Sequence, residues 1–245
     1  MQAGQAADGA VVTAAGLCRG ARELWAVSAY AFVFGVAFGV AAVDVGMEGW
    51  AALLMSMTVY AGGSQFAALE LWARPIAWAP LLVATLGING RHILLGASLY
   101  PWLRSLPRRQ LYVAAFLMSD PNWATSVQAH ARGERDAGIL IGGGMALWIV
   151  WVMGSVAGIW LVDISPGDFH RFGFDLIFAT FLAAVLVGLR RDRSDDLAWL
   201  AAALGAVLAV LVLPPHWHVL AGGLLGGLAG MLVHRCGIGA EHARD

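Results

Sequence analysis

Long runs of apolar residues, separated by short polar or glycine-rich stretches, fill most of the 245-residue chain. A helical membrane crossing needs about 20 apolar residues. The pattern predicts seven or eight hydrophobic segments, at about 24–43, 49–72, 76–100, 110–130, 138–162, 172–189, 197–213 and 217–234. We therefore predict an all-α polytopic membrane helix bundle. A single transmembrane domain spans 24–235, between a flexible N-terminal tail (1–23) and a C-terminal tail (236–245).

The composition supports this interpretation. Apolar residues make up 60% of the chain and charged residues 13%, whereas a soluble domain carries about a quarter charged residues. The net charge is −1, so we expect no nucleic-acid partner, which would require a basic surface. Cys18 and Cys236 lack the spacing of a metal site. We predict no metal and no cofactor.

Three hydrophobic segments are interrupted by glycine, proline or polar side chains. The interruptions lie near 60–66 (Tyr-Ala-Gly-Gly-Ser-Gln-Phe), 87–92 (Gly-Ile-Asn-Gly-Arg-His) and 119–122 (Ser-Asp-Pro-Asn). Glycines permit a helix to break, and Asp followed by Pro fits an N-cap and first helical turn. We therefore predict discontinuous helices at these three positions.

Arginine placement predicts the orientation, because cytoplasmic loops are enriched in arginine. The cluster at 190–193 and the arginines of the C-terminus can both be cytoplasmic, which also places the loop with Arg132 and Arg135 there. The loop with Arg104, Arg108 and Arg109 then falls on the wrong side if 110–130 crosses the membrane. The conflict disappears if 110–130 is two half-helices that turn back.

The first interruption supplies candidate substrate-binding residues. Ser64 could cap a half-helix that begins at Gln65, and the preceding Gly62 and Gly63 would leave backbone N–H groups open to an anion. Broken helices with this geometry bind substrate carboxylates in secondary transporters. The alternative is a glycine kink whose Ser and Gln side chains bond a neighbouring helix.

Ionisable residues within a membrane segment are energetically expensive and so suggest function. The candidates are Glu70, Arg91, His92, Asp120 and Asp175. Asn89 and Arg91 could bind substrate, and Arg91 could neutralise a carboxylate. His92 and Asp120 are candidates for proton coupling, since His titrates near physiological pH. The structural alternatives are a helix cap at Asp120 and an ion pair of Arg91 with Asp120 or Glu70.

The order and spacing of several blocks resemble the AzlC/YgaZ family of branched-chain amino acid exporters. These blocks are Tyr60–Phe66, Asn89–His92, Ser98–Pro101 and Ser119-Asp120, and the resemblance is concentrated in 30–125. It implies export of branched-chain amino acids, drive by the proton gradient and a small AzlD-type membrane partner. One position departs from the family, which commonly follows its Asp with Glu, because here Pro121 and Asn122 follow Asp120.

We therefore expect a multi-pass inner-membrane exporter of apolar amino acids with a cytoplasmic C-terminus, and not an enzyme. Its partners would be the amino acid, the lipid bilayer and the AzlD-type protein, with a homo-oligomer as a further option. The alternatives are a structural subunit of a transport complex, or an exporter of another small apolar solute. An intramembrane hydrolase using Ser64, His92 and Asp120 would lack the Gly-x-Ser-x-Gly motif.

Overall fold

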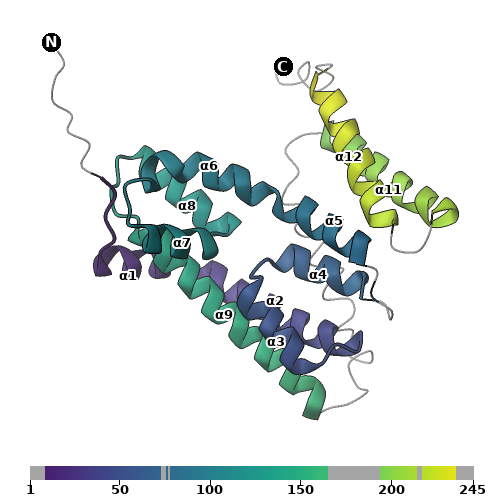
Figure 1. Cartoon of the computed structure of the whole chain (residues 1–245), viewed down its shortest axis with the longest axis horizontal. Coiled ribbons are helices and arrows are strands. Elements are labelled where there is room, and N and C mark those ends of the chain that lie inside the picture. Colours follow the sequence, from purple (N-terminus) through teal and green to yellow (C-terminus); the bar gives the residue numbers. More distant parts are fainter. Residues whose placement is uncertain (1–8, 73–75, 77, 165–193, 214–216, 236–245) are drawn as a thin grey trace. The chain divides into compact units, whose positions relative to one another are not determined.

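The computed structural model describes residues 9–72, 76, 78–164, 194–213 and 217–235, and these residues are helical apart from turns and one isolated bridge (Figure 1). The helices are α1 (Ala14–Glu23), α2 (Trp25–Asp44), α3 (Gly49–Thr58), α4 (Gly62–Glu70), α5 (Trp78–Asn89), α6 (Arg91–Leu103), α7 (Arg108–Phe116), α8 (Asp120–Ala131), α9 (Gly138–Ile164), α11 (Ser194–Val212) and α12 (His218–Arg235). The all-α prediction is confirmed. The predicted segment 172–189, with Asp175, lies outside the described residues.

Four of the described helical stretches are long and apolar enough to cross a membrane. They are Trp25–Asp44, Trp78–Leu103, Gly138–Val162 and Asp195–Val212, and two shorter apolar helices cover Gly49–Thr58 and Ala221–Val233. The predicted count of seven or eight hydrophobic segments is therefore not confirmed.

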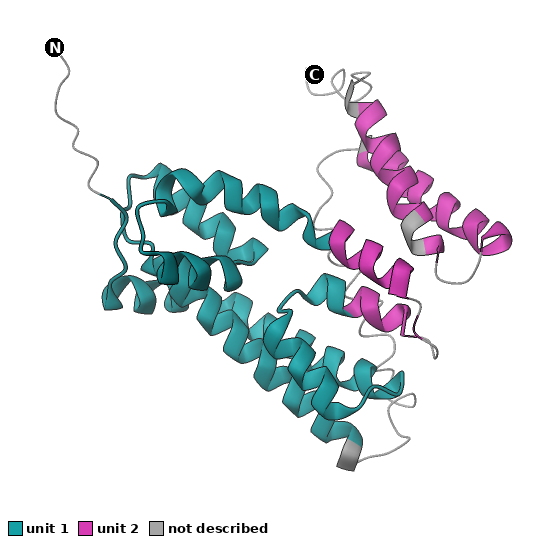
Figure 2. Ribbon diagram, in the orientation of Figure 1, with its two compact units in different colours: residues 1–65, 88–169 teal, residues 66–87, 170–245 magenta. Residues whose placement is uncertain are grey.

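Two compact units divide the chain (Figure 2). Unit 1 contains residues 1–65 and 88–169, and unit 2 contains residues 66–87 and 170–245. In unit 2, α11 and α12 pack closely, with Gly222 and Gly226 of α12 facing Ala202 of α11. Unit 1 contains nearly all the residues of the three interruptions, so the candidate site lies there.

Helices α2 and α9 form the scaffold of unit 1 and run parallel. Their contact depends on glycine: a Cβ added at Gly35 would overlap the carbonyl oxygen of Trp151, and one at Gly39 would overlap that of Ser155. The contacts advance in the same direction along both helices, so the helices point the same way. Small residues allow helix backbones to approach this closely in membranes. The glycines at i and i+4 thus pack within the chain.

The N-terminal residues 9–23, expected within a tail, are tied to the beginning of α9. The Thr13 side chain caps α1 by accepting from Gly16 N, and it also bonds the Asp136 carboxylate. Arg19 Nη1 lies 2.8 Å from Glu134 Oε2. A Cβ at Gly20 would overlap the backbone of Ile139. Helix α1 therefore packs against the beginning of α9.

Helices α7 and α8 form a hairpin that begins and ends at the same end of unit 1. Consecutive residues of the N-terminal segment bond both flanking loops: Ala10 N donates to Ser105 Oγ (2.8 Å), and Val11 N donates to the Arg135 carbonyl (3.0 Å). The two loops are thus neighbours. We call this the arginine end, after Arg19, Arg22, Arg104, Arg108, Arg109, Arg132 and Arg135. The two half-helices turn back, which places both arginine loops on one face.

The chain also reverses between α3 and α4. From Ser56 to Tyr60, the chain contacts α9 at residues progressively nearer its beginning. Ser56 bonds Ser155, the Met57 carbonyl accepts from Trp148 Nε1, and the Tyr60 hydroxyl donates to the Gly144 carbonyl. The contacts then return, because Gly62 faces the Trp151 ring. Tyr60 at the turn has φ 46°, a left-handed conformation that is strained for a bulky residue.

The interruption at 87–92 is milder. α5 ends at Asn89 and α6 begins at Arg91, but Gly90 between them keeps helical angles (φ −53°, ψ −27°). Because the chain does not turn there, Trp78–Leu103 is long enough for one crossing. The second predicted break is therefore a local interruption, whereas the first and third are reversals.

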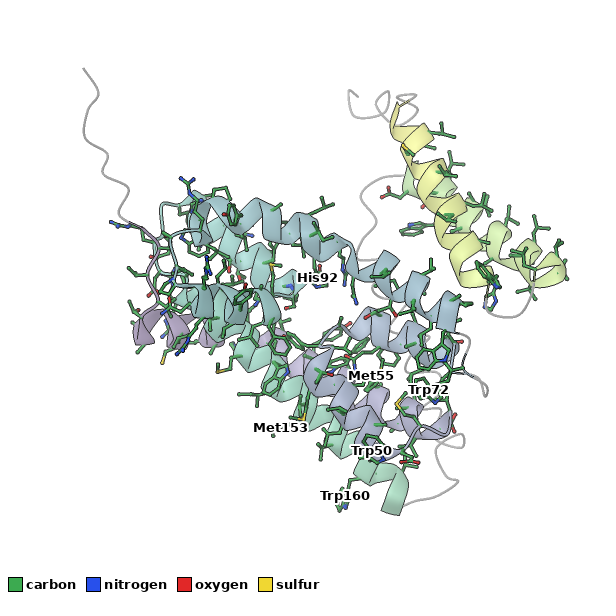
Figure 3. The ribbon with its side chains drawn as sticks, in the orientation of Figure 1. Trp50, Met55, Trp72, His92, Met153 and Trp160 are labelled. Atoms are coloured by element: carbon green, nitrogen blue, oxygen red, sulfur yellow. The ribbon has the colours of Figure 1, made fainter. Side chains whose placement is uncertain are left out.

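Exposed tryptophans mark the end of unit 1 opposite the arginine end. Trp50 and Trp160 are 66% and 63% exposed, and both lie at the far ends of α3 and α9 (Figure 3). Gly138 and Trp160 are 22 residues apart along α9, which corresponds to about 33 Å of helix. This matches a hydrocarbon core of about 30 Å with tryptophans at its boundary.

Candidate functional site

The three interruptions meet in unit 1 through three side-chain contacts. Asn89 Nδ2 donates to Ser64 Oγ (3.1 Å), which joins the second interruption to the first. Arg91 Nη2 lies 3.0 Å from Asp120 Oδ2, which joins the second to the third. The first is joined to the α7–α8 hairpin, which contains the third, because the Tyr60 ring lies 6.3 Å from the Phe116 ring, between centroids. The contacts form a closed ring, which we call the break ring.

Ser64 and Asn89 form the first contact of the ring. Ser64 is buried, and its hydroxyl also donates to the Ala61 carbonyl (3.0 Å), so Ser64 Oγ has a partner on each side. Gly63 beside it is exposed. The Oδ1 of Asn89 is buried and has no hydrogen-bond partner among the described residues. An unpaired buried acceptor is unfavourable, so this atom is suited to a donor from a bound molecule.

Gln65 turns away from the ring into the helix packing. Its Oε1 accepts from Ala61 N (3.3 Å), and its Nε2 donates to Ser56 Oγ (3.4 Å). Ser56 Oγ in turn lies 2.8 Å from Ser155 Oγ on α9. Gln65 is fully buried. For this residue the contacts match the alternative in which the side chain bonds a neighbouring helix.

Arg91 and Asp120 form an ion pair, and both side chains stay about half exposed, at 49% and 51%. His92, at the beginning of α6 (Figure 3), is half-buried, with Nδ1 3.2 Å from the Asn89 carbonyl oxygen. The predicted N-cap at Asp120 is wrong by one residue. Ser119 is the N-cap, because its extended backbone leads into α8, and Asp120 is the first helical residue. That position leaves the carboxylate available to Arg91.

Asn122 holds the turn between α7 and α8 and was not among the predicted site residues. It is fully buried. Its Oδ1 accepts from Ser119 N (2.7 Å), and its Nδ2 donates to the carbonyls of Leu117 (2.7 Å) and Leu140 (3.1 Å). The residue therefore locks the turn and fixes it against α9. A signal in the sequence could have found it, since Asn122 lies in the block where this chain departs from the family pattern.

Tyr60 is a second residue that sequence reasoning did not single out. Its hydroxyl donates to the Gly144 carbonyl (3.2 Å), and its ring lies 6.3 Å from that of Phe116, between centroids. It thereby contacts the α7–α8 hairpin and α9 at once. The left-handed backbone at Tyr60 is maintained by these contacts, a type of strain that concentrates at functional sites.

The three residues of the hypothetical hydrolase do not assemble into a triad. Ser64 bonds Asn89 and Ala61. His92 Nδ1 faces a backbone carbonyl, and Asp120 pairs with Arg91. A hydrolytic triad needs a nucleophile bonded to its base and a base bonded to its orienting acid. None of the contacts given above joins Ser64, His92 and Asp120 to one another.

The fold and the break ring define a polytopic membrane protein with discontinuous helices whose broken ends converge, an arrangement found around the substrates of secondary transporters. The chain belongs to the AzlC protein family, whose model matches residues 26–164, more than half of its length. This confirms the predicted family and extends the match through α9.

Several relatives have similar sequences. The inner membrane protein YgaZ of Escherichia coli (strain K12) is 27% identical over 203 residues, covering 80% of this chain and 82% of its own. The branched-chain amino acid transport protein AzlC of Bacillus subtilis (strain 168) is 24% identical over 158 residues, covering 64% and 61%. An uncharacterized membrane protein of Helicobacter pylori (strain J99) is 24% identical over 180 residues, covering 73% and 78%. No solved structure matches the chain.

Proposed function

We propose that the protein is a secondary exporter of branched-chain and other apolar amino acids across the cytoplasmic membrane, and that the break ring is its substrate site. The observation that carries this proposal is the half-exposed ion pair between Arg91 and Asp120. The Bacillus subtilis relative, named as a branched-chain amino acid transport protein, supports the substrate class.

The ion pair matches the charges of an amino acid. Every zwitterionic amino acid carries one carboxylate and one ammonium group, so Arg91 can receive the first and Asp120 the second. Substrate binding would exchange one ion pair for two, and no charge would remain unpaired in a low-dielectric site. An unpaired charge there would be strongly unfavourable. Each side chain keeps about half of its surface open, which leaves room for the exchange.

The beginning of α4 provides a second group of contacts. Helix N-termini favour anions, and the first turn of α4 contains Gly62 and Gly63, of which Gly63 is exposed. Asn89 Oδ1 is an unpaired acceptor nearby and is suited to an ammonium N–H. We assign Gly62, Gly63, Ser64, Asn89 and Arg91 to substrate binding, with Gln65 supporting the turn behind them.

We further propose that export is coupled to protons through Asp120 and His92. Protonation of Asp120 would release Arg91 from its pair, so the proton and the substrate would act on the same contact. His92 lies one residue from Arg91, at the beginning of α6. Because its Nδ1 faces the Asn89 carbonyl, a proton on that ring would affect the residue that contacts Ser64.

A small AzlD-type membrane protein remains our proposed partner, with self-association as a second option. Large apolar side chains on α6 are strongly exposed, among them Ile93 and Leu94 at 76% and 72%. Such a surface suits lipid or another apolar helix. We place the arginine end and the C-terminus in the cytoplasm, according to the positive-inside rule.

Efflux from cells tests the proposal. Cells loaded with a leucine-containing dipeptide would express the wild-type chain, with and without the AzlD-type protein, or the Arg91→Ala or Asp120→Asn variant. We expect wild-type cells to export leucine faster than empty-vector cells and both variants to fall to the vector level. Leucine efflux at the wild-type rate in both variants would contradict the assignment of the ion pair.

A further inference from the structure

Three aromatic rings pack together next to the end of α7, each supplied by a different part of unit 1. Tyr60 comes from the α3–α4 turn, Phe116 from the last turn of α7, and Trp148 from α9. The Phe116 ring lies 6.3 Å from Tyr60 and 6.5 Å from Trp148, between centroids, and it meets Trp148 at 65°. These separations are typical of interacting aromatic rings.

Hydrogen bonds fix the outer two rings, and the middle one stays accessible. The Tyr60 hydroxyl donates to the Gly144 carbonyl (3.2 Å), and Trp148 Nε1 donates to the Met57 carbonyl (3.1 Å). Phe116 has no polar group to anchor and is 46% exposed. The cluster therefore has rigid walls and an accessible apolar surface between them, as expected of an apolar subsite.

The cluster adjoins the charged pair along the chain, through Phe116 and the turn that leads to Asp120. The Tyr60 ring packs against that of Phe116, and Asp120, the first residue of α8, follows Phe116 by four residues across the turn. Phe116 ends α7 immediately before the turn at 117–119. A molecule whose ammonium group rests on Asp120 would therefore hold its side chain within reach of the aromatic rings.

We propose that Tyr60, Phe116 and Trp148 form the subsite for the aliphatic side chain of the transported amino acid, with Phe116 as the main selectivity residue. This inference rests on the proposed function, since the charged end of the ligand is taken to lie at Arg91 and Asp120. Branched aliphatic side chains larger than that of alanine are the ligands that this surface suits, because their affinity rises with the apolar area they bury.

Competition binding tests the subsite. The purified chain would be assayed with radiolabelled leucine against unlabelled alanine, valine and leucine, as wild type, Phe116→Ala and Phe116→Leu. The wild type should prefer leucine to alanine. Phe116→Ala should lower the affinity for leucine about tenfold and the affinity for alanine by less than about twofold, because selectivity in an apolar pocket depends on side-chain size. Phe116→Leu, which retains an apolar side chain if the alanine variant fails to fold, should show a smaller loss with the same ranking.

Tyr112→Ala is the matched control, because Tyr112 is an aromatic residue of the same helix, 72% exposed and outside the cluster. It should leave both affinities unchanged. Equal losses for leucine and alanine in the Phe116 variants, or the same selectivity change in Tyr112→Ala, would overturn the subsite while leaving the proposed function standing. Failure of the folded wild type to bind any of the three amino acids would overturn both.

Discussion

The guanidinium of Arg91 and the carboxylate of Asp120 form an ion pair, 3.0 Å from Nη2 to Oδ2, between two interruptions of the helix pattern. One residue begins α6 and the other begins α8. Intramembrane charges are rare and usually functional, and pairing makes these two tolerable when no ligand is bound. The pair therefore links the stability of the break ring to the proposed recognition of a zwitterion.

Loss of either charge should impair transport more than folding. Arg91→Ala or Asp120→Asn removes one charged contact to the substrate, and such a contact contributes about 1.5–3 kcal/mol. We expect leucine affinity to fall about 10- to 100-fold, as measured by competition binding. Arg19→Gln is the control, because it removes a surface ion pair with Glu134 at the arginine end and should leave affinity unchanged.

Cysteine labelling should place the two loops that flank the α7–α8 hairpin on one side of the membrane. In a background with Cys18→Ser and Cys236→Ser, Ser105→Cys and Arg132→Cys should both react with an impermeant maleimide from the same side. Val45→Cys, between α2 and α3, should react from the opposite side. Labelling of positions 105 and 132 from opposite sides would mean that 110–130 crosses the membrane.

The glycine contact between α2 and α9 should be sensitive to a single methyl group. Gly35→Ala or Gly39→Ala would push a Cβ into the backbone of α9, and overpacking of this kind costs about 1–3 kcal/mol. The melting temperature in detergent should fall. A Cβ added at Gly223 meets no atom within 4 Å, so Gly223→Ala should leave the melting temperature unchanged or raise it slightly. Equal effects at both sites would contradict the tight helix contact.

Asn122 should be required for the turn that presents Asp120. Asn122→Ala leaves the Leu117 and Leu140 carbonyls without their donor, and unsatisfied buried groups cost about 1–3 kcal/mol each. Thermal melting should show this loss. Gln128→Ala, at an exposed position of the same helix, is the control. A wild-type melting temperature for Asn122→Ala would show that the turn is held by other contacts.

The attachment of α1 to α9 should weaken in acid. Backbone N–H groups of Asp136 and Arg135, followed by Arg19, lower the pKa of Glu134 below its ordinary value of 4.5. A lowered pKa means that the stabilisation is present above about 4.5 and is lost as the pH falls through the folded-state pKa. The effect should be small, since the side chain is 31% exposed. The melting temperature should fall less between pH 6 and pH 4 in Glu134→Gln than in the wild type. An equal fall in both proteins would mean that other groups cause the acid sensitivity.

The positions of the interruptions are predictable from the sequence because their signals are local. Gly62-Gly63-Ser64 and Ser119-Asp120-Pro121 each disfavour a continuous helix within a few residues. The conflict among the arginine loops likewise predicts that α7 and α8 turn back, since only a reversal brings both loops to one face. The partner of Arg91 is less determined, because Asp120 and Glu70 are both available to it in the sequence and only the fold selects Asp120.

The convergence of the interruptions is not predictable from the sequence. Asn89 and Ser64 are 25 residues apart, and Tyr60 and Gly144 are 84 apart. Contacts at such separations depend on the tertiary packing of α2, α3 and α9. The same holds for α1, whose helix is stabilised by Asp136 and Glu134 from the other half of unit 1. The importance of Tyr60 is visible only through its partners and its backbone conformation.

Transport by purified protein in liposomes measures whether the chain itself moves apolar amino acids. The wild-type chain, alone and with the AzlD-type protein, would be reconstituted, and uptake of leucine, valine, alanine and lysine would be measured with and without an imposed pH gradient. We predict transport of leucine and valine above alanine, none of lysine, acceleration by the gradient, and loss of all transport in Asp120→Asn. If the reconstituted protein moves none of these amino acids, the chain is not their exporter. If Asp120→Asn transports leucine like the wild type, Asp120 does not take part in transport.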